Sequence, residues 1–144
     1  MHEQRPIRRV KNLTQGRFFL IFGPPSQPLL VYDGSGDFDG DGIADLLWRN
    51  TNGANIVWLM DGETIKERGQ LPTVGGGWTI SGVGDFDMDG MADVFWNNPD
   101  TGANSIWLLN GTERKARGTI PSVDKSWSPF GVYDMNADSM ADIL

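Results

Sequence analysis

Cysteine is absent from this 144-residue chain, and histidine occurs only once, as His2. Without cysteine there can be no disulfide, no thiol catalysis and no thiolate metal site, while the redox compartment stays open. One histidine near the terminus and no nucleophile elbow leave acid–base and nucleophilic catalysis without residues to perform them. The acid pair Glu63 and Glu67 falls on a segment expected to be an exposed strand, which argues against a glycosidase. We therefore do not expect an enzyme.

Long apolar runs are also lacking, so no membrane span is expected. Residues 1–11 are basic and polar, and no apolar stretch follows them, so no signal peptide is visible. The net charge of −7 argues against nucleic acid as a partner. The chain does contain 19 glycines and 8 prolines, a composition that suits an all-β chain with many turns better than a helical one.

Aspartate and glycine are concentrated in the stretch Gly36-Asp37-Phe38-Asp39-Gly40-Asp41-Gly42-Ile43-Ala44-Asp45. Counted from Asp37, the carboxylates fall at positions 1, 3, 5 and 9. Gly42 at position 6 permits the sharp backbone turn that a loop around a hard cation requires. The stretch recurs at residues 85–93 and, with changes, at residues 134–142. These three acidic loops predict cation sites.

The third acidic loop departs from the pattern, because Ser139 replaces the glycine and Asn136 removes one charge. A left-handed backbone at Ser139 would cost about 1 kcal/mol. Together the three loops hold eleven of the nineteen acidic residues, so three divalent cations would change the net charge from −7 to −1. A solvated acidic turn without metal is the alternative. An EF-hand fits less well, because its glutamate belongs at position 12, where this chain has Trp48 and Trp96.

The acidic loop belongs to a longer repeat, since Asp37 and Asp85 are 48 residues apart and Asp85 and Asp134 are 49 apart. This period lies in the range of propeller blades. Around each loop we expect a first strand before it, a second after it, then two more joined by a type I′ turn at Asp61-Gly62 or Asn110-Gly111. The predicted fold is all-β, with blades of four antiparallel strands. About three blades are expected in one propeller segment: the last two strands of a blade (1–29), two full blades (30–76 and 77–125) and the first strands of another (126–144).

The loop with its flanking Leu47-Trp48-Arg49 and Trp58-Leu59-Met60-Asp61-Gly62 resembles the FG-GAP/VCBS repeat family, the blades of integrin-α-like propellers. The resemblance covers roughly residues 30–144. It implies Ca²⁺ as the ion, and proteins that are mostly extracellular or cell-surface adhesion and ligand-binding modules, some of them lectins. Carried over by position, the implied metal ligands, which at position 7 act through the backbone carbonyl, are Asp37, Asp39, Asp41, Ile43 and Asp45; Asp85, Asp87, Asp89, Met91 and Asp93; and Asp134, Asn136, Asp138, Met140 and Asp142.

The six tryptophans also follow the repeat. They form the equivalent pairs Trp48 and Trp96, Trp58 and Trp107, and Trp78 and Trp127. This periodicity favours packing between blades, and an exposed platform for sugar rings is the alternative. Two functions remain open: a calcium-stabilised recognition module with a glycan or protein ligand, and a purely structural segment of a larger secreted protein.

Ring closure follows from the number of blades. Propellers close with about four to eight blades, so three are too few. Strands at the C-terminal end complement those at the N-terminal end, and two chains would give six blades. We therefore expect a homodimer that closes a six-bladed ring, with a fragment of a longer propeller as the alternative.

Overall fold

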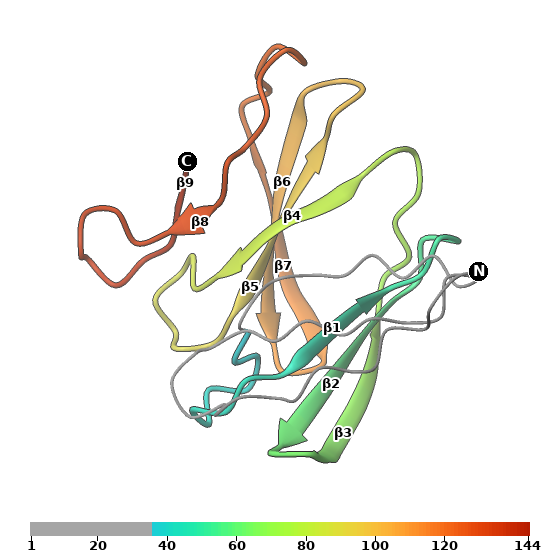
Figure 1. Cartoon of the computed structure of the whole chain (residues 1–144), viewed down its shortest axis with the longest axis vertical. Helices are drawn as coiled ribbons and strands as arrows, with labels where there is room; N and C mark the ends of the chain where they lie inside the picture. Colours follow the sequence, from blue (N-terminus) through green and yellow to red (C-terminus); the bar gives the residue numbers. More distant parts are fainter. Residues whose placement is uncertain (1–35) are drawn as a thin grey trace, which may run out of the picture.

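Strands are the only regular elements in residues 36–144, the part of the chain that the computed structural model describes. They form three antiparallel sheets that follow one another along the sequence (Figure 1). The predicted all-β fold with antiparallel blades is confirmed. The first sheet contains β1 (Leu46–Arg49), β2 (Asn55–Asp61) and β3 (Thr64–Leu71); the second contains β4 (Thr79–Gly84), β5 (Asp93–Asn98), β6 (Ala103–Asn110) and β7 (Glu113–Ile120); the third contains β8 (Val132–Tyr133) and β9 (Asp142–Ile143).

The second sheet is a four-stranded blade with the order β4-β5-β6-β7. The first sheet shows three strands, and its expected first strand lies outside the described residues, as does the predicted segment 1–29. The bridge between Gly36 and Asp45 occupies the place that the pair Gly84 and Asp93 occupies in the second sheet. The two sheets are thus built on the same plan. The unit boundaries proposed from the repeat stay a prediction.

The hairpin turns between the last two strands differ in type from the prediction. The two-residue loop that joins β2 and β3 consists of Gly62 and Glu63, because Asp61 pairs with Thr64. Only Gly62 has a positive φ, 61°, whereas a type I′ turn requires it at both central residues. Glycine at the first central position is the type II′ pattern. The predicted type I′ turn is therefore wrong.

The first strand of the third unit is shorter than predicted. We expected the first strands of a blade in residues 126–144, but β8 contains only Val132 and Tyr133. Pro129 interrupts the segment because it has no N–H to donate to a neighbouring strand. A loop therefore precedes β8.

The hydrophobic core joins the first two sheets. Along much of β2 and β6, buried residues alternate with half-buried or exposed ones, whereas the central strand β5 is buried throughout. Two tilted tryptophan pairs, with ring centroids 4.9 Å and 4.8 Å apart, repeat the same packing within each of the two sheets. We predicted packing between blades, and these pairs instead join neighbouring strands of one blade. The pairs are Trp48 with Trp58 and Trp96 with Trp107. The core cluster consists of Phe38, Leu47, Val57, Leu59, Leu71, Ile80, Ala92, Val94, Trp96, Trp107 and Leu109.

Successive sheets approach each other closely at β4 and β8. A Cβ atom at Gly82 would overlap the side chain of Val132, and a Cβ atom at Gly84 would lie 2.8 Å from Val132 Cγ1. Glycine at these two positions therefore permits the third sheet to lie against the second. The side-by-side arrangement of sheets places the acidic loops of neighbouring units next to one another.

A one-residue bulge interrupts the pairing of the last two strands in each of the first two sheets, β2 with β3 and β6 with β7. Between Leu108 and Leu109 of β6 the register shifts, and Lys115 of β7 is the residue left without a partner. The same shift occurs between Leu59 and Met60 of β2, where Lys66 of β3 is the extra residue. A bulge bends its strand and changes the direction of the side chains that follow. In this chain the bulges take Lys66 and Lys115 out of the alternation of side chains between the two faces of the sheet.

Candidate metal sites in the acidic loops

The backbone of the three acidic loops has the same left-handed turns at positions 4 and 6. At position 6 the φ angles are 85° at Gly42, 84° at Gly90 and 72° at Ser139. Ser139 thus adopts the left-handed backbone that glycine adopts in the first two loops. At position 4 the second and third loops adopt positive φ without glycine, at Met88 (62°) and Ala137 (63°). Sequence reasoning missed this strain, because only the first loop has glycine there.

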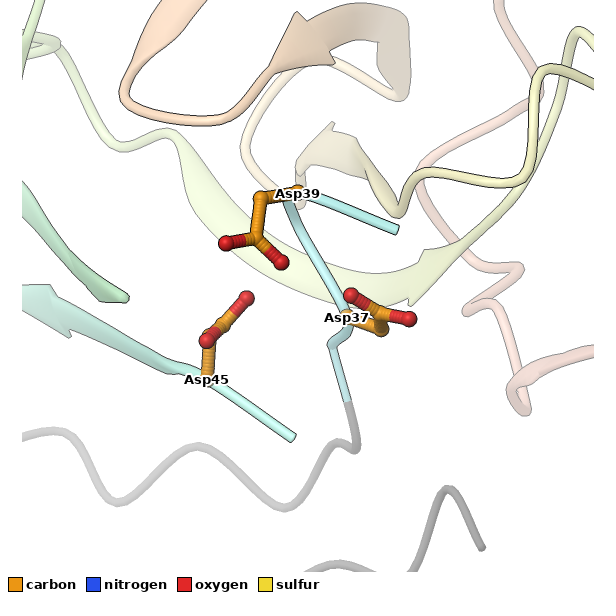
Figure 2. Close-up of side chains that lie close together, drawn as sticks. All are labelled: Asp37, Asp39 and Asp45. Carbon is orange, nitrogen blue, oxygen red and sulfur yellow. The ribbon is translucent and has the colours of Figure 1, made fainter. Parts of the chain in front are cut away.

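The first loop brings three carboxylates together. Oxygens of Asp37, Asp39 and Asp45 all lie within 4.8 Å of one another, and Figure 2 shows the three carboxylates around a common space. In the second loop the corresponding group is Asp85, Asp87 and Asp89. Within the described residues, the carboxylates of the third loop form no such group of three. Among the ligands that the family resemblance implies, the structure brings together positions 1, 3 and 9 in the first loop and positions 1, 3 and 5 in the second loop.

The position-1 aspartates also organise their own loops. Asp37 accepts a hydrogen bond from the position-6 amide of Gly42 at 2.8 Å, and Asp85 accepts the equivalent bond from Gly90 at 2.8 Å. In the third loop Ser139 donates to Asp134 at 3.0 Å. The loops therefore keep their shape through carboxylate–amide bonds of their own.

Position 9 has a structural role that sequence reasoning did not predict. Asp45 is 2% exposed, and its carboxylate accepts hydrogen bonds from the amides of Phe38 at 2.7 Å and Met60 at 2.8 Å. Asp93 accepts the equivalent two bonds, both 2.8 Å, from loop and third strand in the second unit. Burial raises the pKa of both aspartates to about 6, although the amide bonds act to lower it. These carboxylates fasten each loop to the third strand of its blade.

Two lysines contact the acidic loops, and sequence reasoning missed both. Lys66 Nζ lies 2.6 Å from Asp39 Oδ2 and also contacts Asp41, while Lys115 Nζ lies 2.7 Å from Asp87 Oδ2 and also contacts Asp89. Both lysines are the extra residues of the bulges. Their 49-residue separation, at equivalent places in the fourth strand, is the signal that would have found them.

The lysine contacts shift the titration of the groups they join. The hydrogen bonds that Lys66 donates to Asp39 and Asp41 raise the pKa of the lysine, and those that Lys115 donates to Asp87 and Asp89 raise the pKa of Lys115. The Lys66 bond lowers the pKa of Asp41. For Asp89, burial acts to raise the pKa, but Lys115 and the Met91 amide together leave it lowered. An ammonium group thus lies against the carboxylates at positions 3 and 5 of the first and second loops.

The donor set fits a calcium ion. Carboxylate oxygens are the ligands that Ca²⁺ prefers, and each of the first two loops offers several within a short distance. Asp87 Oδ1 is buried and has no hydrogen-bond partner, which is costly for a carboxylate oxygen unless a positive group lies beside it. Lys115 contacts only the other oxygen, Oδ2. The unpaired oxygen is the observation that favours a further cation in the second loop.

The structure consists of repeated antiparallel sheets, and each unit contains an acidic loop. The protein is therefore a repeat module built of blades. A family model described as an FG-GAP-like repeat matches residues 37–96 and again residues 85–144. Together these matches cover three quarters of the chain, and the protein belongs to the FG-GAP-like repeat family. No curated protein and no solved structure matches the chain. Among residues 36–144 no helix could cross a membrane.

Proposed function

We propose that this protein is a calcium-binding, calcium-stabilised β-propeller module that serves recognition, with a glycan or a protein as its ligand, and that it acts outside the cell without catalysing a reaction. The observation that carries the calcium part is the convergence of three carboxylates in each of two successive loops, within 4.8 Å. Membership of the FG-GAP-like repeat family supports it. The ligands proposed are those at positions 1, 3, 5, 7 and 9 of each loop.

The lysines set a condition on cation binding. Lys66 and Lys115 contact carboxylates at positions 3 and 5, so an entering cation must displace the two ammonium groups. Both lysine side chains are about one third exposed and are long and flexible, and they can turn toward solvent. The aspartates then exchange the lysine ammonium group for the cation, so their negative charge is balanced in both states.

Calcium stabilisation is tested by thermal melts of the purified chain in EDTA and in millimolar Ca²⁺. A ligand that binds only the native state raises stability by mass action, so the melting temperature should be higher with Ca²⁺. Magnesium at the same concentration is the control for ionic strength, since it prefers octahedral sites with several waters. Equal melting temperatures in EDTA and Ca²⁺ would refute a structural metal. Recognition is tested separately on a glycan array, where an absence of ligands would favour the purely structural alternative.

Self-association is the second part of the proposal, and the tryptophans of the repeat support it. Trp78 packs against the core cluster, but its equivalent Trp127 is 72% exposed and nearby Phe130 is 80% exposed. The third unit thus exposes Trp127 at the place where the second unit packs Trp78 against the core, and Phe130 adds to the exposed apolar surface. We propose that a second copy supplies the next blade, in a homodimer that closes a six-bladed ring. Sedimentation should show a dimer that Trp127→Ser weakens; a monomer at high concentration would contradict it.

A further inference from the structure

A hollow of about 250 Å³ lies where the connection between β3 and β4 passes over the second sheet. Its wall includes residues 72–75 of the connection, the half-buried Trp78, and Trp96 and Trp107 of the sheet. Arg49 holds the connection in place, because its guanidinium donates to the carbonyls of Val74 at 2.8 Å and Trp78 at 2.9 Å. The hollow is therefore bounded by fixed backbone on one side and by core indoles on the other.

Two arginines of β7, Arg114 and Arg117, complete the wall. In a regular strand, residues three apart point to opposite faces. The bulge at Lys115 places both arginines on the same face. Arg117 pairs with Trp107 and Arg114 pairs with Leu109, and residues 107 and 109 share one face of β6. Both guanidinium groups therefore lie on the face that lines the hollow.

The two guanidinium groups have no anionic partner in residues 36–144. Neither forms an ion pair there, whereas the neighbouring Lys115 contacts two aspartates. The Arg114 guanidinium lies over the Trp107 ring, 4.7 Å from its centroid. This stacking orients the guanidinium N–H groups and leaves them available for hydrogen bonds. A planar guanidinium with free donors suits a carboxylate, because two parallel hydrogen bonds can form. The charge of this wall is thus complementary to a small organic anion.

The wall also contains a buried donor without a partner. Trp96 is only 1% exposed, and its indole N–H is buried without a hydrogen-bond acceptor. Buried indole N–H groups nearly always have one, and leaving a donor unpaired costs about 1–3 kcal/mol. Trp48, the equivalent tryptophan of the first unit, has the same unpaired N–H. The unmet donor is therefore a property of the repeat.

We propose that this hollow binds a small ring compound that carries a carboxylate, with an acidic monosaccharide of the hexuronate type as the expected source. The carboxylate would face Arg114 and Arg117, and the ring would lie against Trp78. The volume is below the roughly 300–1,000 Å³ of pockets for drug-sized ligands, which limits the occupant to about one ring. This inference rests on the proposed recognition function and names the class of its ligand.

Calorimetry with sodium galacturonate and sodium glucuronate tests the proposal on the full chain in Ca²⁺. Galactose and glucose are the neutral probes, and sodium benzoate is the aromatic carboxylate. We expect a hexuronate to bind, the neutral sugars to bind at least tenfold more weakly, and both Arg114→Gln and Arg117→Gln to weaken hexuronate binding about tenfold or more. The matched control is Arg68→Gln, because Arg68 lies over Trp58 in the first sheet at 5.2 Å but does not line the hollow.

The outcomes separate the ligand sources and the two proposals. Arginine-dependent binding of benzoate alone would support a carboxylate site and assign it to aromatic acids. Equal binding of neutral and acidic sugars, no binding of any carboxylate, or binding unchanged in both arginine variants would overturn the proposal. Melts of the same samples in Ca²⁺ and EDTA, together with the glycan array, show whether calcium-dependent recognition survives such a result.

Discussion

The carbonyl of Asp37 accepts a hydrogen bond from the Ala92 amide at 2.7 Å, and thereby joins the first acidic loop to the second. The carbonyl of Asp85 and the amide of Ala141 form the same bond, also 2.7 Å, between the second loop and the third. In both bonds the acceptor is the backbone carbonyl of the position-1 aspartate of a loop. Because the loops are joined in series, we expect the chain to melt in one cooperative transition with Ca²⁺ and in EDTA, and calorimetry showing two separate transitions would contradict this.

Replacing Asp89 by alanine should remove one cation site. Asp89 belongs to the carboxylate group of the second loop, so its loss leaves too few oxygen ligands there, while the first loop is unchanged. Isothermal titration with Ca²⁺ should show a stoichiometry lower by one. Glu63→Ala is the matched control, since it removes the same charge from an exposed turn. A wild-type stoichiometry in Asp89→Ala would show that the second loop is not a site.

Replacing Lys115 by methionine should have opposite effects on the metal-free and metal-bound protein. Without the ammonium group, Asp87 and Asp89 repel each other, so the melting temperature in EDTA should fall. Calcium no longer competes with a lysine, and its affinity should rise severalfold. Lys125→Met serves as control, because Lys125 forms no ion pair within residues 36–144. Weaker calcium binding in Lys115→Met would mean that the lysine assists the cation.

Replacing Asp93 by asparagine should destabilise the fold even when no metal is present. The buried carboxylate accepts hydrogen bonds from the amides of Phe86 and Leu109, and an asparagine amide group can accept only one of them. The unpaired donor should cost about 1–3 kcal/mol of the free energy of unfolding. Urea unfolding in EDTA measures this without a contribution from calcium. The exposed Asp100→Asn is the control, and equal stability of the two variants would argue against the fastening role.

Replacing Gly82 by alanine should disturb the packing of the third sheet against the second. The new Cβ atom overlaps Val132, and overpacking of this kind costs about 1–3 kcal/mol. The second substitution Val132→Ala makes room, so the double variant should recover part of the loss. Thermal melts of the four proteins form a double-mutant cycle. Additive effects would show that the two residues do not touch in solution.

Local features of this chain were predictable from its sequence. The acidic loops, the strand after each loop and the hairpins follow from residue types within a few positions, and the 48- to 49-residue period extended them to neighbouring units. The equivalence of the tryptophans in successive units followed from the same period, but their contacts within each sheet did not. The sequence also placed Ser139 where two loops have glycine, which indicated the cost of the left-handed backbone found there.

Features that depend on register were not predictable in this way. Lys66 reaches Asp39, 27 residues away, only because a bulge displaces it, and no residue type in β2 or β3 marks that bulge. Asp45 was expected to be a metal ligand alone, yet its second partner, the Met60 amide, is fixed by the position of the third strand. The hollow beside Arg114 likewise requires the packing of two units. In each case the contact is set by tertiary geometry that a single sequence does not encode locally.

The outer strand of the second sheet, β7, determines how the molecule avoids aggregation. Its first seven residues are exposed, and it carries Glu113, Arg114, Lys115 and Arg117. An open strand edge can template pairing with another chain, and clustered charge together with a bulge is a common protection against it. Edge-to-edge growth into fibres is therefore disfavoured at this strand. The exposed apolar surface lies instead on the third unit, so association through faces can proceed while uncontrolled strand addition at this edge is suppressed.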